Sequence, residues 1–361
     1  MRICFLADSE SIHTKRWCNY FAEKGHDIHL ISFKQKCPIN QVTFHSIYAG
    51  EIQVKGGNWR VLLKIGKLRQ LVKKIAPDVL HAHYATSYGL VGAFAGFSPY
   101  VVTALGSDVL ISPRQSLVYK WLLKLVFFKA DWITTMADHM KVAAKKYIGD
   151  FDNKTQVLPF GIDTSLFNDD NRTYATNRLV IVSTRNFEDV YRIPDVLHAV
   201  NAVRKQVDSV ELHLVGDGSK REEVEELVRA LNLSGVTKIH GRIPQPKIVD
   251  ILKKSHVFLS LSSSDGNNIS LNEAMACGCL PIASKIPANE QWISHGKNGF
   301  LTEVGNVDEI VEYILESHRK FSDLIREALP LNRKIISDKA DWHKNMKGME
   351  DKYLALVNKN E

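Results

Sequence analysis

The sequence predicts an α/β protein with two doubly wound domains, each a parallel sheet covered by helices. Apolar runs of strand length alternate with amphipathic helical segments throughout, which favours this architecture. A chain of 361 residues is also too long for one core of ordinary size. Residues 168–177 contain no large aliphatic side chain, which is typical of a linker between domains. We therefore expect domains at 1–167 and 178–338.

Composition excludes several classes of protein. Apolar residues make up 45% and charged residues 24%, as in globular domains. The five cysteines are scattered, and the closest pair, Cys277 and Cys279, suits neither a usual zinc knuckle nor a redox pair, which favours reduced thiols. The net charge of +7 is compatible with a nucleotide diphosphate, an anionic lipid or a nucleic acid. The sequence has no zinc-finger, basic-zipper or RNA-binding signature, so we expect no nucleic-acid partner.

The first domain opens with a strand, a loop, a helix and a second strand. These segments are expected at 2–7, 9–15, 16–25 and 26–33. The loop contains His13, Thr14 and Lys15, which can bind an anion at the start of the following helix. Ordinary helix capping is the alternative, and both interpretations stay open.

The rest of the first domain continues the same alternation. After a strand within 41–54 we expect a basic helix at 59–75, a strand at 77–83, and a buried helix with a buried strand at 84–107. A second basic helix at 112–131, a strand at 132–136, a helix at 138–147 and a final strand with its turn at 156–163 follow. The uncharged segment 84–107 is long enough to span a bilayer, but Pro99 in its middle favours buried elements. His83 ends a strand directly before a helix, a position that favours a functional role.

The second domain repeats this rhythm. We expect strands at 178–185, 211–219, 237–244 and 256–262, and helices from about 194 and at 221–233, 246–255 and 307–315. Arg185 ends the first of these strands. The carboxyl ends of parallel strands meet at one edge of a sheet, where ligands bind.

The stretch 260–278 combines a strand end, a polar loop and a helix. Asp265 lies in the loop, and Glu273 follows eight positions later on the helix. Gly266 allows the backbone to approach a ligand closely. The helix start presents unpaired N–H groups, which suit an anion.

The spacing of Asp265 and Glu273 resembles the acid-x7-Glu motif of the retaining glycosyltransferases of family 4. The segments AMACGCLPIAS at 274–284 and EQWISHGKNGFL at 290–301 follow in register with that family. The resemblance implies the GT-B fold, in which two Rossmann-like doubly wound domains face each other across a cleft and the final helix crosses back, so that 339–361 packs on the first domain. That helix carries one apolar stripe, formed by Trp342, Met346, Met349, Tyr353 and Val357.

The resemblance also implies roles for individual residues. In the family the loop cradles the donor sugar, the second acid holds the ribose, and an arginine at a strand end grips the diphosphate. The residues at the catalytic positions are Asp265, Arg185 and His83, the last of which is implied to face the donor sugar. The residues at the donor-binding positions are Glu273, Arg192, Tyr191, Gly216, Arg242, Ile243, Gly266, Asn267, Asn268, Ile269, Ser270 and Leu271. His13, Thr14 and Lys15 occupy a loop that touches the donor phosphates in the family, although here it lacks glycine.

The sequence departs from the family pattern in several places. Asp265 stands where glutamate is usual, and Asn272 stands where an apolar residue is usual. Leu105 replaces the histidine of the family's HisGlyxAsp turn, which weakens the expectation of a donor contact there.

A further departure concerns the second phosphate-binding cation. The family has a lysine six residues after the arginine, whereas this chain has Tyr191 there, followed by Arg192. Two interpretations stay open. Arg192 substitutes for the lysine, or Tyr191 donates a hydrogen bond while Arg185 acts alone as the cation.

The resemblance implies retaining, metal-independent transfer of a hexosyl group from a UDP- or GDP-sugar to a glycan or lipid-linked glycan, in surface polysaccharide or glycoconjugate biosynthesis. We expect no cofactor besides this donor substrate. Asp150 and Asp152 mimic an acidic metal triplet but follow a helix, so we expect a solvated loop there. Two alternatives stay open: a sugar-nucleotide epimerase or phosphorylase of the same architecture, and a non-catalytic nucleotide- or glycan-binding protein.

Two features bear on where the chain acts. The first apolar run is too short for the core of a signal peptide, so we expect a cytoplasmic protein. The basic helices at 59–75 and 112–131 are suited to an anionic membrane surface, which would place the protein peripherally on the inner face of the cytoplasmic membrane. Packing of their apolar faces in the core is the alternative, and both interpretations stay open.

Overall fold

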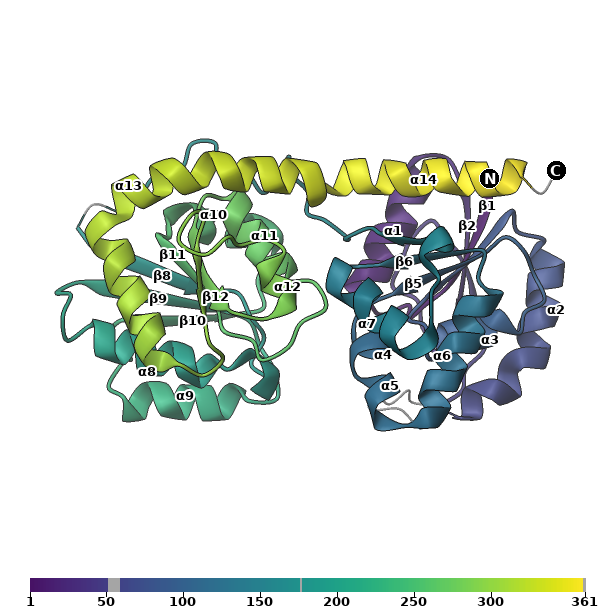
Figure 1. Ribbon diagram of the computed structural model, residues 1–361, viewed down its shortest axis with the longest axis horizontal. Helices are drawn as coiled ribbons and strands as arrows, with labels where there is room; N and C mark the ends of the chain where they lie inside the picture. Colours follow the sequence, from purple (N-terminus) through teal and green to yellow (C-terminus); the bar gives the residue numbers. More distant parts are fainter. Residues whose placement is uncertain (51–58, 176, 360–361) are drawn as a thin grey trace. The chain divides into compact units, whose positions relative to one another are not determined.

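A computed structural model describes residues 1–50, 59–175 and 177–359 (Figure 1). The chain divides into two compact units, Met1–Pro159 with Met346–Glu361 (unit 1) and Phe160–Asn345 (unit 2). The sequence analysis expected the first domain to end at 167 rather than at Pro159, and the returning segment to begin at 339 rather than at Met346. The difference has a local cause, because Ile162 exchanges backbone hydrogen bonds with Ala340 and Trp342 at 2.7 and 2.8 Å, and both Ile162 and Phe167 are buried in the core of unit 2.

Unit 1 is built on a seven-stranded sheet in the order β3-β2-β1-β4-β5-β6-β7, and every neighbouring pair is parallel. The strands are β1 (Arg2–Leu6), β2 (Asp27–Ser32), β3 (Thr43–Ser46), β4 (Val79–His83), β5 (Tyr100–Ala104), β6 (Trp132–Thr135) and β7 (Thr155–Val157). Every residue of β4 and β5 is buried, as expected for central strands covered on both faces. Residues 51–54 of the strand predicted within 41–54 lie outside the described residues.

The helices of unit 1 are α1 (Ile12–Glu23), α2 (Ile65–Ile75), α3 (Tyr88–Ala93), α4 (Ser107–Leu110), α5 (Ser112–Gln115), α6 (Leu117–Lys129), α7 (Asp138–Ile148) and part of α14 (Trp342–Asn358), with short 3-10 turns at η1 (Trp59–Lys64) and η2 (Asp152–Lys154). The predicted helix at 112–131 is interrupted at Ser116, whose extended backbone ends α5 and whose Oγ accepts the N–H of Val118 to cap α6. The predicted buried helix and strand at 84–107 are confirmed as α3 and β5. Across the described residues, no helix combines the length and apolar content needed to cross a membrane.

The carboxyl-terminal helix α14 packs its predicted stripe into unit 1. Met346, Met349 and Tyr353 are buried there, and Val357 is half-buried. The Tyr353 hydroxyl lies in hydrogen-bond contact with Nδ1 of His81 on β4. From Met346 onward, helix α14 is therefore part of the hydrophobic core of unit 1.

Unit 2 contains a six-stranded parallel sheet in the order β10-β9-β8-β11-β12-β13. The strands are β8 (Leu179–Ser183), β9 (Val210–Val215), β10 (Thr237–Gly241), β11 (Val257–Ser260), β12 (Leu280–Ser284) and β13 (Phe300–Thr302). The helices are α8 (Ile193–Val203), α9 (Arg221–Ala230), α10 (Gln245–Lys254), α11 (Ile269–Ala276), α12 (Pro287–Glu290) and α13 (Val307–Lys339), with a 3-10 turn at η3 (Asp189–Tyr191). Helix α13 extends far beyond the predicted 307–315 and is kinked at Lys320.

The segment predicted as a linker is attached to unit 2. The Arg172 guanidinium donates to the carbonyl oxygens of Ser255 and Cys277, which follow α10 and α11. It also lies 3.9 Å from the centre of the Tyr174 ring. Carbonyl groups at helix ends have no partner within their own helix, so Arg172 supplies donors that these helix ends need.

Candidate functional site

The predicted site residues of unit 2 gather at the carboxyl edge of its sheet. Strand β11 lies between β8 and β12, and the pairs Phe258 with Val182 and Ser260 with Ala283 set the register of the three strands. The loops after these strands therefore begin side by side. This is the edge at which ligands bind in open parallel sheets.

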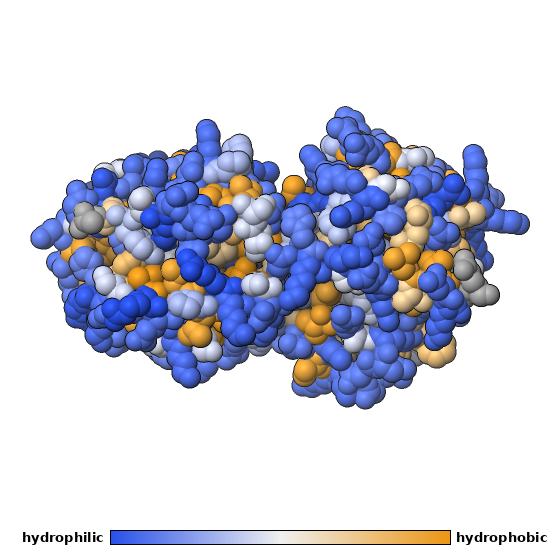
Figure 2. All heavy atoms as spheres, turned by 90° about the horizontal axis from the view of Figure 1, so that it is seen from above, coloured by the Kyte–Doolittle hydropathy of each residue, from blue (hydrophilic) through white to orange (hydrophobic). Residues whose placement is uncertain are grey.

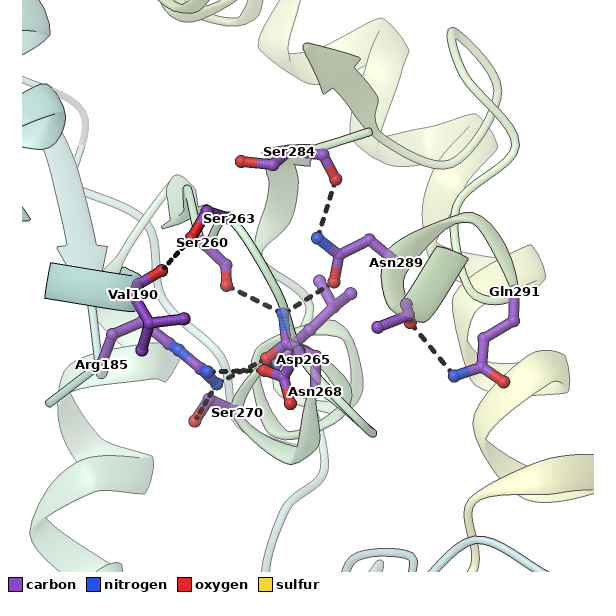
Figure 3. A network of polar contacts seen from close by, with 12 residues as sticks. Arg185, Val190, Ser260, Ser263, Asp265, Asn268, Ser270, Ser284, Asn289 and Gln291 are labelled. Atoms are coloured by element: carbon purple, nitrogen blue, oxygen red, sulfur yellow. Dashed lines mark hydrogen bonds and ion pairs between the residues drawn. The ribbon is translucent and has the colours of Figure 1, made fainter. Parts of the chain in front are cut away.

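Arg185 is the centre of this edge (Figure 3). Its Nη2 donates to Oδ2 of Asp265 at 2.6 Å, and its Nη1 donates to Oδ1 of Asn268 at 2.8 Å and, less closely, to Oγ of Ser270 at 3.4 Å. The side chains of Arg185 and Asp265 are 7% and 15% exposed. A nearly buried guanidinium is thus held in one orientation by a carboxylate and an amide.

Asn268 holds the loop and the helix together. Its Oδ1 accepts the backbone N–H of Leu271 at 3.1 Å and caps α11, while its Nδ2 donates to Oγ of Ser260 and to Oδ1 of Asn289, each at 2.8 Å. Asn268 is completely buried, so these bonds satisfy its amide and fix the beginning of α11.

A second contact ties the Asp265 loop to the loop that follows β8. The backbone N–H of Ser263 donates to the carbonyl oxygen of Val190 at 2.8 Å. Val190 belongs to η3, the turn that also carries Tyr191. The two loops are therefore positioned as one structure around Arg185.

Several buried polar atoms at this edge have no hydrogen-bond partner within the described part of the chain. They are Nε of Arg185, both amide atoms of Asn267 and Asn272, Oγ1 of Thr184, and the hydroxyls of Ser183, Ser262 and Ser284. Buried polar atoms are normally paired, and an unpaired one is costly. Asn272, which stands where the family pattern has an apolar residue, is one of them. A polar ligand suits this group of donors and acceptors.

Tyr191 and Arg192 take different positions around Arg185. The Arg185 guanidinium lies over the Tyr191 ring, 4.2 Å from its centre. Arg192 instead forms a two-bonded ion pair with Asp195, at 2.6 and 3.2 Å, in the first turn of α8. Of the two interpretations, this geometry favours Arg185 as the principal cation. It places Tyr191 as the surface on which the guanidinium stacks, an arrangement that neither interpretation included.

Gly216 lets two backbone segments touch beneath the site. It follows β9 with φ of +156°, and a Cβ there would lie 2.4 Å from the carbonyl oxygen of Arg185. Gly218 makes a similar approach to Phe187, at 2.3 Å. Only glycine fits such contacts, so this turn allows the backbone of the loop that carries Arg185 to pack directly against the end of β9.

The other predicted donor-binding residues follow strand ends at this edge or lie on α11. Arg242 is exposed and Ile243 half-buried, directly after β10. Glu273 is half-buried on α11, two turns or less from the capped end that carries Ile269, Ser270 and Leu271. Gly266 and Asn267 lie in the loop between Asp265 and the cap.

The predicted residues of unit 1 lie at the equivalent edge of its own sheet. His83 ends β4 in a cluster of rings, with the ring centres of Trp17 and Phe5 at 4.8 and 5.6 Å. Burial, together with the nearby charge of His13, lowers the pKa of His83 to about 3. Burial and the Arg16 charge lower the pKa of His13 to about 4. Both imidazoles are therefore neutral near pH 7.

The predicted loop at 9–15 is wrong in its second half, because α1 begins at Ile12. His13, Thr14 and Lys15 thus form the first turn of the helix rather than a loop before it. Thr14 is buried, whereas Lys15 is exposed. The first turn still carries the N–H groups that suit an anion.

The turn at 105–108 has a structural explanation. The Asp108 carboxylate is completely buried and accepts the backbone N–H groups of Ala85, Leu105 and Gly106 at 2.7 to 3.3 Å. Burial raises the pKa of Asp108, although these three donors act in the opposite direction. Asp108 therefore joins the loops that follow β4 and β5.

Sequence reasoning missed Ser260, Ser262, Ser284 and Asn289 as members of the polar edge. Ser260 and Ser262 lie at the end of the strand predicted at 256–262, which is a usable signal, whereas no strand was predicted before Ser284. Asn289 lies on the short helix α12 and donates to the carbonyl oxygen of Ser284 at 2.8 Å. Nothing in its local sequence indicates that it meets Asn268.

The acidic pattern at Asp150 and Asp152 can also be placed. Asp150 and Asp152 lie beside Lys145 at 2.8 and 2.9 Å on the surface of unit 1. Over residues 1–50, 59–175 and 177–359, no group of three or more His, Cys, Asp and Glu side chains is arranged to hold a metal ion.

Comparison with known proteins adds two family matches. Residues 2–137 match the model described as "Glycosyl transferase 4-like", and residues 167–320 match "Glycosyl transferases group 1". Among curated proteins, N-acetyl-alpha-D-glucosaminyl L-malate synthase of Bacillus anthracis is 25% identical over 329 residues, which is 85% of each chain.

Solved structures share the whole fold at low sequence identity. Sucrose-phosphate synthase from Thermosynechococcus elongatus superposes with a TM-score of 0.82 at 17% identity, covering 99% of each chain. Anabaena Alr3699/HepE in complex with UDP-glucose gives a TM-score of 0.77 at 17% identity, covering 99% of this chain and 100% of that one.

Proposed function

Because the chain belongs to the GT-B glycosyltransferases, we propose that it moves a hexosyl group from a nucleotide diphosphate sugar to an acceptor hydroxyl with retention of anomeric configuration. The donor is a UDP- or GDP-sugar, and the Anabaena relative binds UDP-glucose. No metal ion or cofactor takes part. The reaction takes place in the cytoplasm.

The observation that carries this proposal is the nearly buried guanidinium of Arg185 among polar atoms that have no hydrogen-bond partner in the described residues. Sugar transfer breaks the bond between the anomeric carbon and the diphosphate, so negative charge grows on the phosphate oxygens. Fixed donors aimed at that charge lower the barrier. Arg185 supplies the charge, and the backbone N–H groups at the start of α11 add to it.

The ion pair between Arg185 and Asp265 positions the cation in the protein without donor. When the diphosphate binds, Nε of Arg185 and the unpaired amide of Asn267 are suited to its oxygens, while Asp265 accepts hydrogen bonds from sugar hydroxyls. The half-buried carboxylate of Glu273 binds the ribose. The departing phosphate takes the proton of the incoming hydroxyl, as the family resemblance implies for retaining transfer.

The principal cation that faces the diphosphate in this proposal is Arg185 rather than Arg192. Asp195 already engages Nε and one Nη of Arg192. Stacking on Tyr191 orients the Arg185 guanidinium, whose two Nη atoms are held by Asp265 and Asn268, so that Nε is the atom suited to contact phosphate. His83, whose lowered pKa leaves it neutral at pH 7, does not act as an acid.

The acceptor we propose is a glycan or lipid-linked glycan in surface polysaccharide or glycoconjugate biosynthesis. A second candidate is a small hydroxy acid. The Bacillus anthracis relative favours it, because the name of that protein describes an L-malate glycoside.

The first test is a thermal-shift screen of UDP, GDP and their sugars with the full chain, because a ligand that binds only the folded state raises its stability. The binding variant is Arg185→Met. Its matched control is Arg178→Met, which removes an exposed arginine paired with Glu211 at the opposite end of β8. We expect one nucleotide to stabilise the wild type and Arg178→Met, and to leave Arg185→Met unshifted.

The second test follows the product. With the best donor and a panel of glycans and hydroxy acids, NMR of the anomeric proton should report the donor's configuration in the product. Addition of EDTA should leave the rate unchanged. Donor turnover without acceptor, or only with inorganic phosphate, would instead support the epimerase or phosphorylase alternatives. Equal transfer rates in the wild type and Arg185→Met would contradict the mechanism.

A further inference from the structure

Helix α6 exposes large apolar side chains to solvent. Leu117, Trp121 and Phe128 are 78%, 70% and 69% exposed, and Val118 is 52% exposed. The first three are separated by four and seven residues, so they share one face of the helix. Few large apolar residues of a folded protein are left in water as a continuous stripe.

The opposite face of α6 already anchors the helix in unit 1. Leu123, Val126 and Phe127 are buried there. Ser116 caps the start of the helix, and the Lys154 ammonium donates to the carbonyl oxygens of Phe128 and Ala130 at its end. The helix is therefore complete without its exposed stripe, and core packing does not explain those side chains.

Basic residues surround this stripe. From Val109 to Ala130 the chain has four Lys and Arg residues and no Asp or Glu. By helical position, Lys124 lies between Trp121 and Phe128 on the exposed face, and Lys120 and Lys129 lie toward its two sides. The segment from Val109 to Ala130 therefore combines exposed aromatic and aliphatic side chains with basic residues and no acidic ones.

Two comparisons within the chain set α6 apart. Helix α2 is more basic than α6, yet it buries Leu68, Val72 and Ile75 and exposes mainly charged side chains. Taken separately, the visible face of each unit in Figure 2 is mostly hydrophilic, with smaller hydrophobic groups among the polar side chains. The sequence alone suits both basic helices to a membrane surface. The exposed apolar side chains of α6 distinguish it from α2, whose apolar side chains are mostly buried.

We propose that the exposed face of α6, formed by Leu117, Val118, Trp121, Lys124 and Phe128, docks on an anionic membrane surface. Its apolar side chains enter the boundary between headgroups and acyl chains, and its lysines contact lipid phosphates. The positive charge of the lysines on α6 favours an anionic lipid surface as the binding partner. A second copy packed face to face would oppose Lys124 to the same positive surface, whereas anionic lipids neutralise it.

The proposal concerns unit 1 and is independent of the sugar donor, so its test measures binding without catalysis. The full chain is sedimented with vesicles of phosphatidylcholine alone or with 30% phosphatidylglycerol added, a composition chosen to be roughly that of an anionic leaflet. Binding is expected only with the anionic lipid and should weaken as salt is raised.

Matched variants locate the surface. Lys124→Glu with Lys129→Glu should weaken binding at least tenfold, because each lysine near such a surface strengthens it by about fivefold. Lys73→Glu with Lys74→Glu on α2 changes the net charge equally and should change binding less than threefold. Trp121→Ala with Phe128→Ala should also lose at least tenfold, and all these positions are exposed, so folding is retained.

A spectroscopic readout checks insertion directly. Lipids brominated on their acyl chains should quench part of the tryptophan fluorescence of the wild type, and Trp121→Phe should bind nearly as well while losing that quenching. Equal loss of binding in the α6 and α2 charge variants would overturn the proposal, as would unchanged quenching in Trp121→Phe. A wild type that ignores anionic vesicles but forms a dimer broken by Trp121→Ala would assign this face to a second copy and also overturn it.

Discussion

Removal of the Arg185 side chain should destabilise the loop and helix around it, in the absence of any ligand. Arg185→Met deletes an ion pair of 2.6 Å to Asp265 and a 2.8 Å hydrogen bond to Asn268. Breaking a buried pair by removing one partner costs about 3–5 kcal/mol. The Asp265 side chain is 15% exposed and keeps some contact with water, so we expect the lower end, about 3 kcal/mol.

The pairwise part of this cost can be isolated with Asp265→Asn. That variant keeps an acceptor but loses its charge, so it should cost about 1–2 kcal/mol. The double variant should cost less than the sum of the two single variants, by about 1–2 kcal/mol, because the second substitution removes an interaction that is already broken.

Native-state hydrogen exchange on the full chain is the suitable assay. Two units need not unfold together, so a single unfolding free energy is poorly defined. The opening free energies of α11 amides report the local loss, and amides of β4 in the other unit serve as the internal control. Additive effects, to within about 0.5 kcal/mol, would refute the inference that Arg185 and Asp265 stabilise each other.

Three further outcomes follow from the same geometry. Tyr191→Phe should keep UDP affinity within about twofold, whereas Tyr191→Leu should weaken it by about 2- to 30-fold, the worth of a cation–π contact; calorimetric titration decides, and equal losses would implicate the hydroxyl instead. Gly216→Ala should destabilise unit 2 by about 1–3 kcal/mol, because its Cβ meets the Arg185 carbonyl oxygen; the opening free energies of unit 2 amides in native-state hydrogen exchange measure this. The lowered pKa of His83, about 3, means that an unfolded chain takes up the proton first as pH falls below the ordinary value of 6.5. Its contribution to the stability of unit 1 is therefore complete above pH 6.5 and declines toward pH 3, by at most about 1.4 kcal/mol per pH unit. His83→Gln should flatten that slope in urea unfolding, and an unchanged slope would place the titration elsewhere.

Much of the fold could be predicted because each element satisfies a local rule. Central strands such as β4 and β8 are continuous apolar runs, and helices such as α8 and α9 follow them with helical periodicity. Element ends were less accurate. Helix α1 begins four residues before its predicted start, since Ile12 to Lys15 carry no strong signal for either loop or helix.

The candidate site was predicted as a set of strand ends, and its contacts were not. Arg185 and Asp265 are 80 residues apart in the chain, and their ion pair depends on β11 lying next to β8. The stacking of Arg185 on Tyr191 likewise requires η3 to turn back over the strand end. Helical periodicity does identify α6 as apolar on several sides, but only the packed unit shows which side is left exposed.

The sequence by itself determined the order of strands and helices, the polar loop before α11 and the basic character of α6, because these depend on neighbours along the chain. The tertiary structure decided that Arg185 faces Asp265 and Asn268, that Arg192 turns to Asp195, and that α6 rather than α2 presents apolar side chains to solvent. Those choices depend on which surfaces adjoin after folding, and burial and hydrogen bonding between distant segments settle them together.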